Sequence, residues 1–316
     1  MSSVQTPAAR VGPPAAVPSG RPAGVLLCLV SGVSFGLAAV LAKESFRSGF
    51  TVSSLLVGRF GIAAVVFWVI VAVRRPARPS RLSLVKAVGL GGAGYALQSA
   101  FYFGALTKLN AAMVAQLLYV YPALVLVIAL IRRIESPDGR KLAALLCSAA
   151  GLVLLLQGGA GGGSSPALGV AMALGAAGTY ALYITVAATL PAELDVYLLS
   201  AIVCTAATVS VTCYGVVAGS IHAPAAAAGW GWLVALALVP SVVAIGTFLA
   251  GLRLVGGPVA AILSCVEPVV TALSAAVVFG EGLRPLQVLG AGAVLASVVV
   301  LQTRRRRRAT EDVVPV

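Results

Sequence analysis

The sequence contains very little charge. Only 10% of its 316 residues are Asp, Glu, Lys or Arg, whereas 60% are apolar and the mean hydropathy is +1.04. A soluble domain carries about 25% charged residues, so this chain has too few charges to cover a water-facing surface. The sequence therefore predicts an integral membrane protein.

Residues that perform chemistry are also scarce. The chain has nine acidic residues, one histidine and no Walker motif for ATP. Its five cysteines lie in or near apolar segments without CxxC spacing, which supports neither a metal site nor a disulfide. No carboxylate pair or Ser/His/Asp arrangement has the spacing that an enzyme needs. We therefore predict no cofactor, no metal and no enzymatic activity.

Ten apolar stretches, separated by charge clusters and Gly/Pro/Ser runs, are long enough to cross a membrane. The hydrocarbon core contains no water to bind backbone polar groups, and the stretches lack the alternating pattern of a barrel. They are therefore predicted to be helices. The first five expected spans are roughly 24–41, 51–73, 84–106, 111–131 and 142–156; the second five are 168–188, 196–218, 232–252, 259–279 and 288–301. The predicted fold class is an all-α integral membrane protein with ten transmembrane helices.

The second half of the chain repeats the first. A shift of 146 residues superimposes four pairs of identical residues: Leu106 and Leu252, Ala115 and Ala261, Pro122 and Pro268, Glu135 and Glu281. Because five spans per half is an odd number, the halves must be two inverted five-helix repeats, as in many secondary transporters. The expected domains are a disordered N-terminal tail (1–22), a first repeat (23–157), a Gly/Ser linker (158–166), a second repeat (167–303) and a basic cytoplasmic tail (304–316).

The net charge of +13 comes from basic residues that gather on one side of the membrane. With the N-terminus inside, 17 of the 22 Lys and Arg residues are cytoplasmic and four are outside. This bias predicts a multi-pass protein of the plasma membrane with both termini in the cytoplasm. The last five basic residues directly follow the final span, so we predict contact with anionic lipids and not with nucleic acid: Arg304, Arg305, Arg306, Arg307 and Arg308.

Each half contains a small-residue-rich helix with a proline, followed by an apolar stretch and an acidic residue. This pattern reads AAMVAQLLYVYPALVLVIALIRRIE in the first half and GPVAAILSCVEPVVTALSAAVVFGE in the second, where a Gly-rich helix, LQVLGAGAVLASVVVLQ, follows. Residues 24–302 thereby resemble the EamA-type, ten-helix members of the drug/metabolite transporter superfamily. The resemblance implies export of amino acids or other small metabolites, while more distant relatives carry sugars, nucleotide sugars or phosphorylated metabolites.

Glu267 is an ionisable residue in the middle of a predicted span. Such a residue costs about 2.5–3.5 kcal/mol at a helix centre unless it faces a polar interior, so it is a candidate functional group. Pro268 leaves the carbonyl of Ser264 without its helical partner and creates a polar notch beside the carboxylate. Ser264, Glu267 and Thr271 share a helix face, as expected for the lining of a cavity. The alternative is a structural hydrogen bond or ion pair between helices.

Arg59 is the one basic residue well inside a predicted span. Its guanidinium could anchor a substrate carboxylate or act as the counter-ion of Glu267. Because Arg59 lies only about eight residues from the start of its helix, it could instead extend to the outer interface.

Helix interruptions occupy matching positions in the two halves, where freed backbone groups can meet a polar ligand. They are Pro122, which corresponds to Pro268, and Pro240, which corresponds to Gly94. The alternative is a set of simple kinks, which membrane helices tolerate. Further polar side chains that could complete a substrate cavity, or else serve helix packing and the membrane interface, are Gln98, Tyr102, Gln116, Tyr119 and Tyr183.

The leading hypothesis is a secondary transporter that exports an amino acid or similar small metabolite by alternating access. Glu267 would bind the substrate amine or carry a coupling proton. Alternatives are a transporter of drugs, toxic compounds or nucleotide/sugar-type metabolites, an intramembrane lipid-modifying enzyme, and a channel or structural subunit. The enzyme would need acidic or His clusters at a membrane surface, where the sequence instead has Arg. The predicted partners are a small-molecule substrate and, if transport is coupled, protons; the oligomeric state is left open.

Overall fold

The computed structural model describes residues 21–133, 138–157, 165–191, 194–222, 227–255, 260, 263–282 and 284–311. Side chains are described for all of these except 21, 140, 155, 156, 253 and 301–311. Nearly all of the expected N-terminal tail and linker lie outside the described residues. The same holds for Glu135 and for the side chains of residues 304–308, so the predictions made for them stay predictions.

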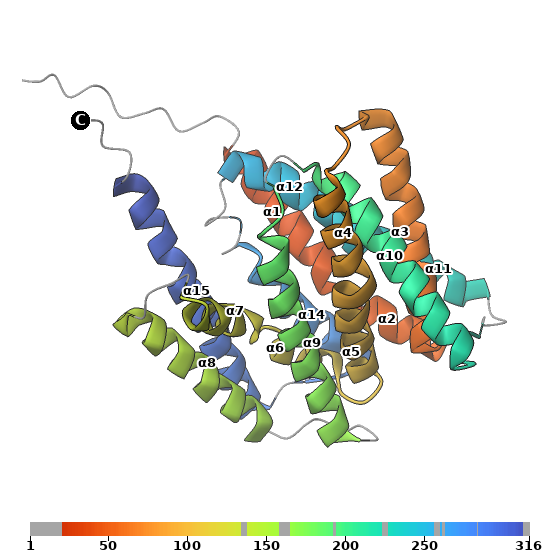
Figure 1. Ribbon diagram of the computed structural model, residues 1–316. Coiled ribbons are helices and arrows are strands. Elements are labelled where there is room, and N and C mark those ends of the chain that lie inside the picture. Colours follow the sequence, from red (N-terminus) through yellow and green to blue (C-terminus); the bar gives the residue numbers. More distant parts are fainter. Residues whose placement is uncertain are drawn as a thin grey trace, which may run out of the picture.

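Every secondary-structure element in the described part of the chain is helical (Figure 1). The first five spans are α1 (Arg21–Gly36) with α2 (Ala38–Arg47), α3 (Val52–Arg74), α4 (Arg81–Gly89) with η1 (Leu90–Tyr95) and α5 (Ala96–Leu106), α6 (Ala111–Leu118) with α7 (Tyr121–Ile131), and α8 (Gly139–Gln157). The second five are α9 (Pro166–Ala187), α10 (Val196–Val217), α11 (Ala227–Ala237) with η2 (Leu238–Val243) and α12 (Ala244–Val255), α14 (Val266–Phe279), and α15 (Pro285–Glu311).

Six helical segments among the described residues are long and apolar enough to cross a membrane: Pro22–Arg47, Val52–Arg74, Ala111–Ile131, Pro166–Ala187, Val196–Val217 and Ala227–Leu252. Shorter apolar helices cover Lys141–Leu154, Val266–Phe279 and Pro285–Val300. The first span continues beyond its predicted end at residue 41. Lys43 and Glu44 remain helical because their charged side chains find partners at the end of the bundle.

Polar side chains fix where several helices begin. Thr51, Ser80 and Asn110 each accept a hydrogen bond from the backbone N–H three residues ahead, and Asp195 accepts two at the start of α10. These bonds satisfy N–H groups that have no partner within the helix.

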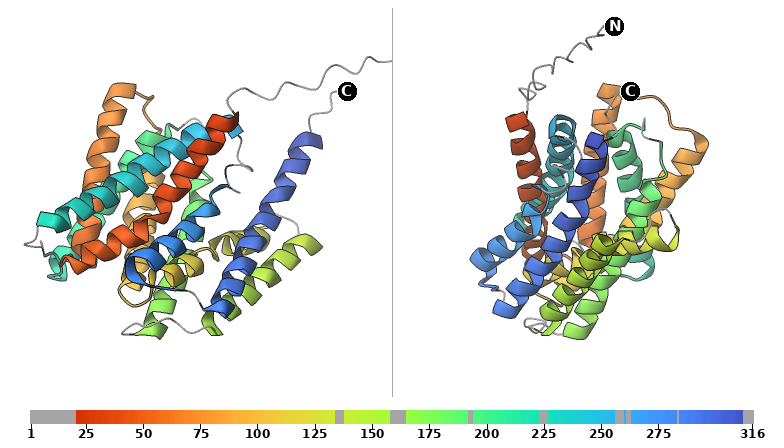
Figure 2. Two further views of the ribbon diagram at one scale, coloured as in Figure 1. Left: turned by 180° about the vertical axis from the view of Figure 1, so that it is seen from behind. Right: turned by 90° about the vertical axis from the view of Figure 1, so that its left-hand side faces the viewer.

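The packing of the helices follows the inverted repeat. The first span packs along the eighth through α1 and α12, and the third packs along the sixth through α5 and α9. The repeat relates these two pairs, because the sixth span is the counterpart of the first and the third span is the counterpart of the eighth. The remaining large interfaces join counterparts directly, α3 with α10 and α8 with α15, and both views in Figure 2 show α8 beside α15. The start of α1 and the end of α15 lie at the same end of the bundle (Figures 1 and 2).

Two π-helical segments interrupt corresponding spans of the two halves. The segment η1 contains Gly94 and divides the third span, while η2 contains Pro240 and divides the eighth. A π-helical turn shifts the register of the backbone hydrogen bonds, and such turns occur often at functional sites. Both segments therefore reorient the side chains around them near the middle of a span.

The fourth and ninth spans are also broken at corresponding positions. Residues 119 and 120 form a turn between α6 and α7, and Pro122 lies in the first turn of α7. In the ninth span, residues 264 and 265 form a turn directly before α14, which contains Pro268. The two turns are related by the repeat shift of about 146 residues.

Gly36 allows α1 to approach α14 very closely. A methyl group added at Gly36 would lie 2.7 Å from Cβ of Val270 and 2.8 Å from the backbone oxygen of Glu267. The carbonyl of Gly36 also accepts a hydrogen bond from Oγ1 of Thr271 at 2.8 Å. Glycine at this position is therefore required by the separation of the two helices.

Replacing Gly36 by alanine is expected to destabilise the protein by about 1–3 kcal/mol, because the new methyl group collides with backbone atoms. This cost exceeds the helix-propensity gain of about 1 kcal/mol for alanine. Thermal unfolding in detergent would measure the effect as a lower Tm. Gly292→Ala is the matched control, since its added methyl group meets nothing within 4 Å; an equal Tm for both variants would contradict the tight contact.

Candidate substrate site

The breaks of the fourth and ninth spans meet at Tyr119. Its hydroxyl lies 3.0 Å from the backbone oxygen of Ser264 and 3.0 Å from Oε2 of Glu267. The Ser264 oxygen is the acceptor that Pro268 leaves without its usual helical donor, and it also accepts from the N–H of Glu267 at 3.0 Å. Tyr119 thus joins the carboxylate to the polar notch beside it.

The Tyr119 hydroxyl has one hydrogen to donate, although it faces two acceptors. It donates either to the carboxylate of Glu267 or to the Ser264 oxygen. A protonated Glu267 can donate to the Tyr119 oxygen while Tyr119 donates to Ser264. The three groups therefore accommodate Glu267 with or without a proton after a single rotation of the hydroxyl.

Arg59 is buried in the bundle, with 7% of its surface exposed. Its Nε is 3.4 Å from Oγ of Ser241 and its Nη2 is 3.5 Å from the hydroxyl of Tyr95, distances at the long end for hydrogen bonds. Its Cζ also lies 5.0 Å from the ring centroid of Phe103. The interpretation that Arg59 extends to the outer interface is therefore wrong, because α3 turns this residue toward η1 and η2.

Arg59 is also not a direct counter-ion of Glu267. Among the described residues, no ion pair joins the two side chains, and the contacts of the guanidinium are uncharged. The site therefore contains two separate charges of opposite sign, one from each half of the chain.

Tyrosine side chains fill the path between these two charges. Consecutive ring centroids are 6.0 Å apart for Tyr119 and Tyr121, 4.6 Å for Tyr121 and Tyr180, and 6.1 Å for Tyr180 and Tyr183. A further 5.9 Å separates Tyr183 from Tyr95, whose hydroxyl faces Arg59. We call these five residues the tyrosine cluster.

Three members of the tyrosine cluster were not among the predicted site residues: Tyr95, Tyr121 and Tyr180. A weak signal in the sequence pointed to each of these three residues. Tyr121 directly precedes Pro122, and Tyr95 directly follows Gly94 at the other paired interruption. Tyr180 lies three residues before Tyr183, which places both rings on one face of α9.

Gln116 and Tyr119 lie on the same side of the fourth span. Gln116 is 2% exposed, and its Oε1 has no hydrogen-bond partner in the part of the chain that the structure describes. A buried acceptor of this kind normally binds a donor from a ligand or an ordered water. Gln116, one of the predicted site residues, therefore offers a hydrogen-bond acceptor next to the tyrosine cluster.

The other predicted residues differ in their surroundings. Tyr102 is close enough to both Glu267 and Arg59 to interact with them electrostatically, and its ring packs on Phe103. Gln98 is buried and accepts a hydrogen bond from Oγ of Ser99 at 3.2 Å. Thr271 is engaged elsewhere, because its hydroxyl donates to Gly36 and fixes α14 against α1.

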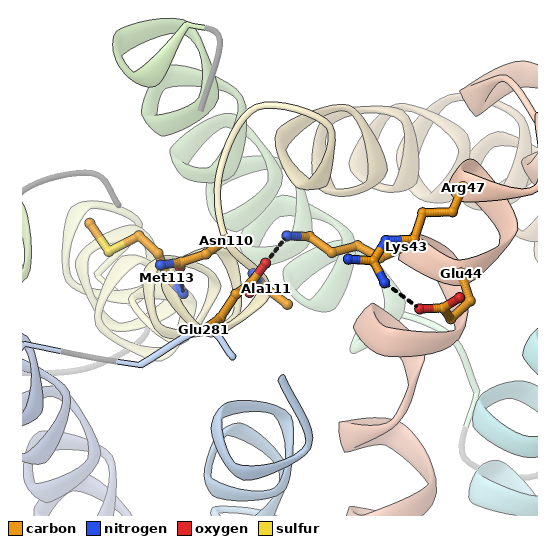
Figure 3. A network of polar contacts seen from close by, with 7 residues as sticks. All are labelled: Lys43, Glu44, Arg47, Asn110, Ala111, Met113 and Glu281. Carbon is orange, nitrogen blue, oxygen red and sulfur yellow. Dashed lines mark hydrogen bonds and ion pairs between the residues drawn. The ribbon is translucent and has the colours of Figure 1, made fainter. Parts of the chain in front are cut away.

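A separate polar network lies around Glu281 (Figure 3). The carboxylate of Glu281, just after α14, pairs with the ammonium group of Lys43 on α2. Its Oε2 also accepts a hydrogen bond of 2.7 Å from the backbone N–H of Ala111 at the start of α6. One side chain thus joins the first, fourth and ninth spans, and the fourth and ninth of these also carry paired breaks. By contrast, the neighbouring pair of Glu44 and Arg47 lies within α2.

Comparison with known proteins assigns the chain to a family. The EamA-like transporter family matches the chain twice, over residues 22–157 and 167–303. The chain belongs to the EamA-like transporter family. It is therefore a multi-pass membrane protein with the ten-helix inverted-repeat fold, and its family is one of transporters and not of enzymes.

EamA-like relatives include an uncharacterized transporter, YcbK, from Bacillus subtilis (strain 168). It is 26% identical over 299 residues, which cover 92% of this chain and 96% of YcbK. A protein with a solved crystal structure is 20% identical, with a TM-score of 0.59 over 91% of this chain and 99% of that one. The second likeness shows the fold alone.

The candidate site lies between the two EamA repeats. The first repeat supplies Arg59, Tyr95, Gln116, Tyr119 and Tyr121. The second supplies Tyr180, Tyr183 and Glu267. Relative motion of the two halves of an EamA transporter would therefore change the distance between the two charges.

Proposed function

We propose that this EamA-like transporter is a secondary carrier that exports an amino acid or a similar small zwitterion across the plasma membrane. The observation that carries the proposal is the pair of opposite charges, Arg59 and Glu267, at the two ends of the tyrosine cluster. Arg59 is buried and Glu267 is partly buried within the bundle, where charged groups are costly unless they serve a function.

Each charge of the site suits one group of a zwitterion, and a small amino acid would contact both charges at once only after motion of the two halves brings Arg59 and Glu267 closer together. The guanidinium of Arg59 presents N–H donors that suit a carboxylate, and its long contacts leave it available for a stronger acceptor. At the other end, the carboxylate of Glu267 and the tyrosine faces suit an ammonium group. The free Oε1 of Gln116 provides another acceptor for an N–H donor.

A proton is the proposed coupling partner. Tyr119 can satisfy Glu267 in its protonated and its deprotonated form, so the site remains hydrogen-bonded in both. Binding of the substrate ammonium to Glu267 would then compete with the proton. This competition is the simplest way to exchange an outgoing substrate for an incoming proton by alternating access.

The proposal of export includes an orientation with both termini in the cytoplasm. Basic residues concentrate at the end of the bundle where α3 ends and α4 begins, which supports the proposal that this end and both termini are cytoplasmic. The network around Glu281 then lies at the outer end. In this conformation it holds the first, fourth and ninth spans together on that side.

Breaking the outer network is expected to open the site to the outside. Glu281→Gln removes the charge that binds Lys43 and weakens the acceptor for Ala111, so the outward-open population should increase about tenfold. Cys265, in the turn beside Ser264, serves as the reporter after replacement of the other cysteines. Its reaction with a membrane-impermeant thiol reagent in intact cells should become faster.

Glu44→Gln is the control for this experiment, because it breaks a pair that lies within α2 and joins no other span. Its labelling rate should remain that of the parent protein. Equal rates for both variants would show that the Glu281 network does not hold the outer side closed.

A transporter of organic-cation drugs is the second candidate, because tyrosine faces and a carboxylate also suit a cation without a carboxylate. Arg59 argues against it. Counterflow in proteoliposomes with labelled amino acids and labelled organic cations would separate the two. Saturable counterflow of an amino acid supports the proposal, whereas counterflow of cations alone contradicts it.

A further inference from the structure

A cavity of about 720 Å³ lies on the membrane-facing side of the bundle, between α3, α4 and α10. In Figure 1, α10 lies between α3 and α4. None of the residues of the candidate substrate site lines this cavity. The cavity is therefore separate from the candidate substrate site.

The wall of the cavity is suited to a hydrocarbon chain. It is formed largely by apolar side chains, and several of them are exposed, including Trp68 at 43% and Val209 at 57%. The indole N–H of Trp68 is already bound, because it donates to Oγ1 of Thr205 at 2.9 Å. A polar solute would find few free partners here, whereas an acyl chain would bury apolar surface.

The length of the cavity also fits an acyl chain. Its lining on α10 extends from Leu198 to Ser210, which is about 18 Å at 1.5 Å per residue. Half of a hydrocarbon core of about 30 Å is about 15 Å. The cavity therefore extends through roughly one leaflet.

A basic connection borders one end of the cavity. Arg78 lines it in the connection between α3 and α4, and Arg75 and Arg81 are exposed nearby in the sequence. Arg74 differs from them, because its Nε is 3.6 Å from the carboxylate of Asp195. Among the described residues, no carboxylate pairs with Arg75, Arg78 or Arg81.

We propose that this cavity is a binding site for one anionic phospholipid. An acyl chain occupies the groove between α3, α4 and α10, and Arg75, Arg78 and Arg81 bind the phosphate headgroup. With the termini in the cytoplasm, this lipid belongs to the cytoplasmic leaflet, whose anionic lipids attract basic side chains. The site would fix the connection between α3 and α4 against α10.

Native mass spectrometry of the full-length protein in a neutral detergent tests the proposal. With equal amounts of phosphatidylglycerol and phosphatidylcholine, one phosphatidylglycerol should bind preferentially. The triple variant R75Q/R78Q/R81Q is expected to weaken this preference about tenfold or more. Ala206→Trp places a large ring in the acyl-chain groove and should reduce binding of the same lipid.

Two controls identify the part of the lipid and the part of the chain that matter. Replacing residues 304–308 by glutamine leaves the cavity unchanged, so it should preserve the preference. Glycerol 3-phosphate has the phosphate but no acyl chain and should not compete with the lipid. Equal binding of both lipids, an unchanged triple variant, or loss of the preference only in the 304–308 variant would overturn the proposal.

Discussion

Glu267→Gln is expected to reduce transport by about 100-fold while the protein still folds. The substitution removes the negative charge that we assign to binding of the ammonium group or the coupling proton. A charged hydrogen bond contributes about 1.5–3 kcal/mol, and 3 kcal/mol corresponds to about 100-fold. Folding is preserved because the glutamine oxygen can still accept the hydrogen bond from Tyr119.

Uptake into proteoliposomes with and without a pH gradient measures this effect. The parent protein should respond to the gradient, whereas Glu267→Gln should be slow in both conditions. Glu44→Gln, a carboxylate at the end of the bundle, should behave like the parent protein. Normal transport by Glu267→Gln with an unchanged response to pH would show that Glu267 neither binds the substrate nor carries the proton.

Arg59→Gln is expected to have a comparable effect on affinity for a substrate carboxylate. Loss of a bidentate, charge-assisted contact in a buried site should raise KM by about 10- to 100-fold. Arg59→Lys keeps the charge but loses the planar fork, so its KM should be intermediate. The graded series separates recognition of a carboxylate from a purely structural role of the side chain.

Concentration-dependent counterflow gives the KM values of these variants. Arg47→Gln is the control, because Arg47 is exposed and its contacts, an ion pair with Glu44 and a cation–π contact with Phe279, lie outside the candidate site. If Arg59→Gln transported an amino acid with the KM of the parent protein, Arg59 would not be the carboxylate anchor. An equal KM for the lysine and glutamine variants would also contradict recognition by charge.

The fold was largely predictable from the sequence, because it follows from hydropathy and repeat patterns that extend over the whole chain. Apolar stretches and the shift of 146 residues indicate ten spans in two inverted halves, and family membership confirms that architecture. Helix ends were less predictable. The first span was predicted to end before Lys43, although pairing with Glu281 satisfies this charge at the end of the bundle.

The candidate site was only partly predictable, because it depends on which face each helix turns toward its neighbours. Glu267 was identifiable as a charge within a span, and the structure places it against Tyr119. The burial of Arg59 was not apparent from its distance to the helix end. The contacts that join Tyr95, Tyr121 and Tyr180 to the tyrosine cluster were also not apparent, because these residues come from three different spans.

The two halves of the inverted repeat differ at the candidate substrate site. Pro122 and Pro268 occupy equivalent positions, but the residue equivalent to Glu267 in the first half is Tyr121. One half therefore contributes a carboxylate and the other an aromatic ring to the same region. This difference gives a substrate with distinct ends a single preferred orientation between the halves.

Counterflow of matched amino-acid analogues tests most directly whether Arg59 and Glu267 bind the two ends of a zwitterion. Proteoliposomes would be loaded with a transported amino acid and challenged with its amide, which lacks the carboxylate, and its keto acid, which lacks the amine. We predict exchange of the intact amino acid and at least about tenfold weaker exchange of either analogue. Equal exchange of all three compounds, or exchange of the amide alone, would contradict recognition of a zwitterion between these residues.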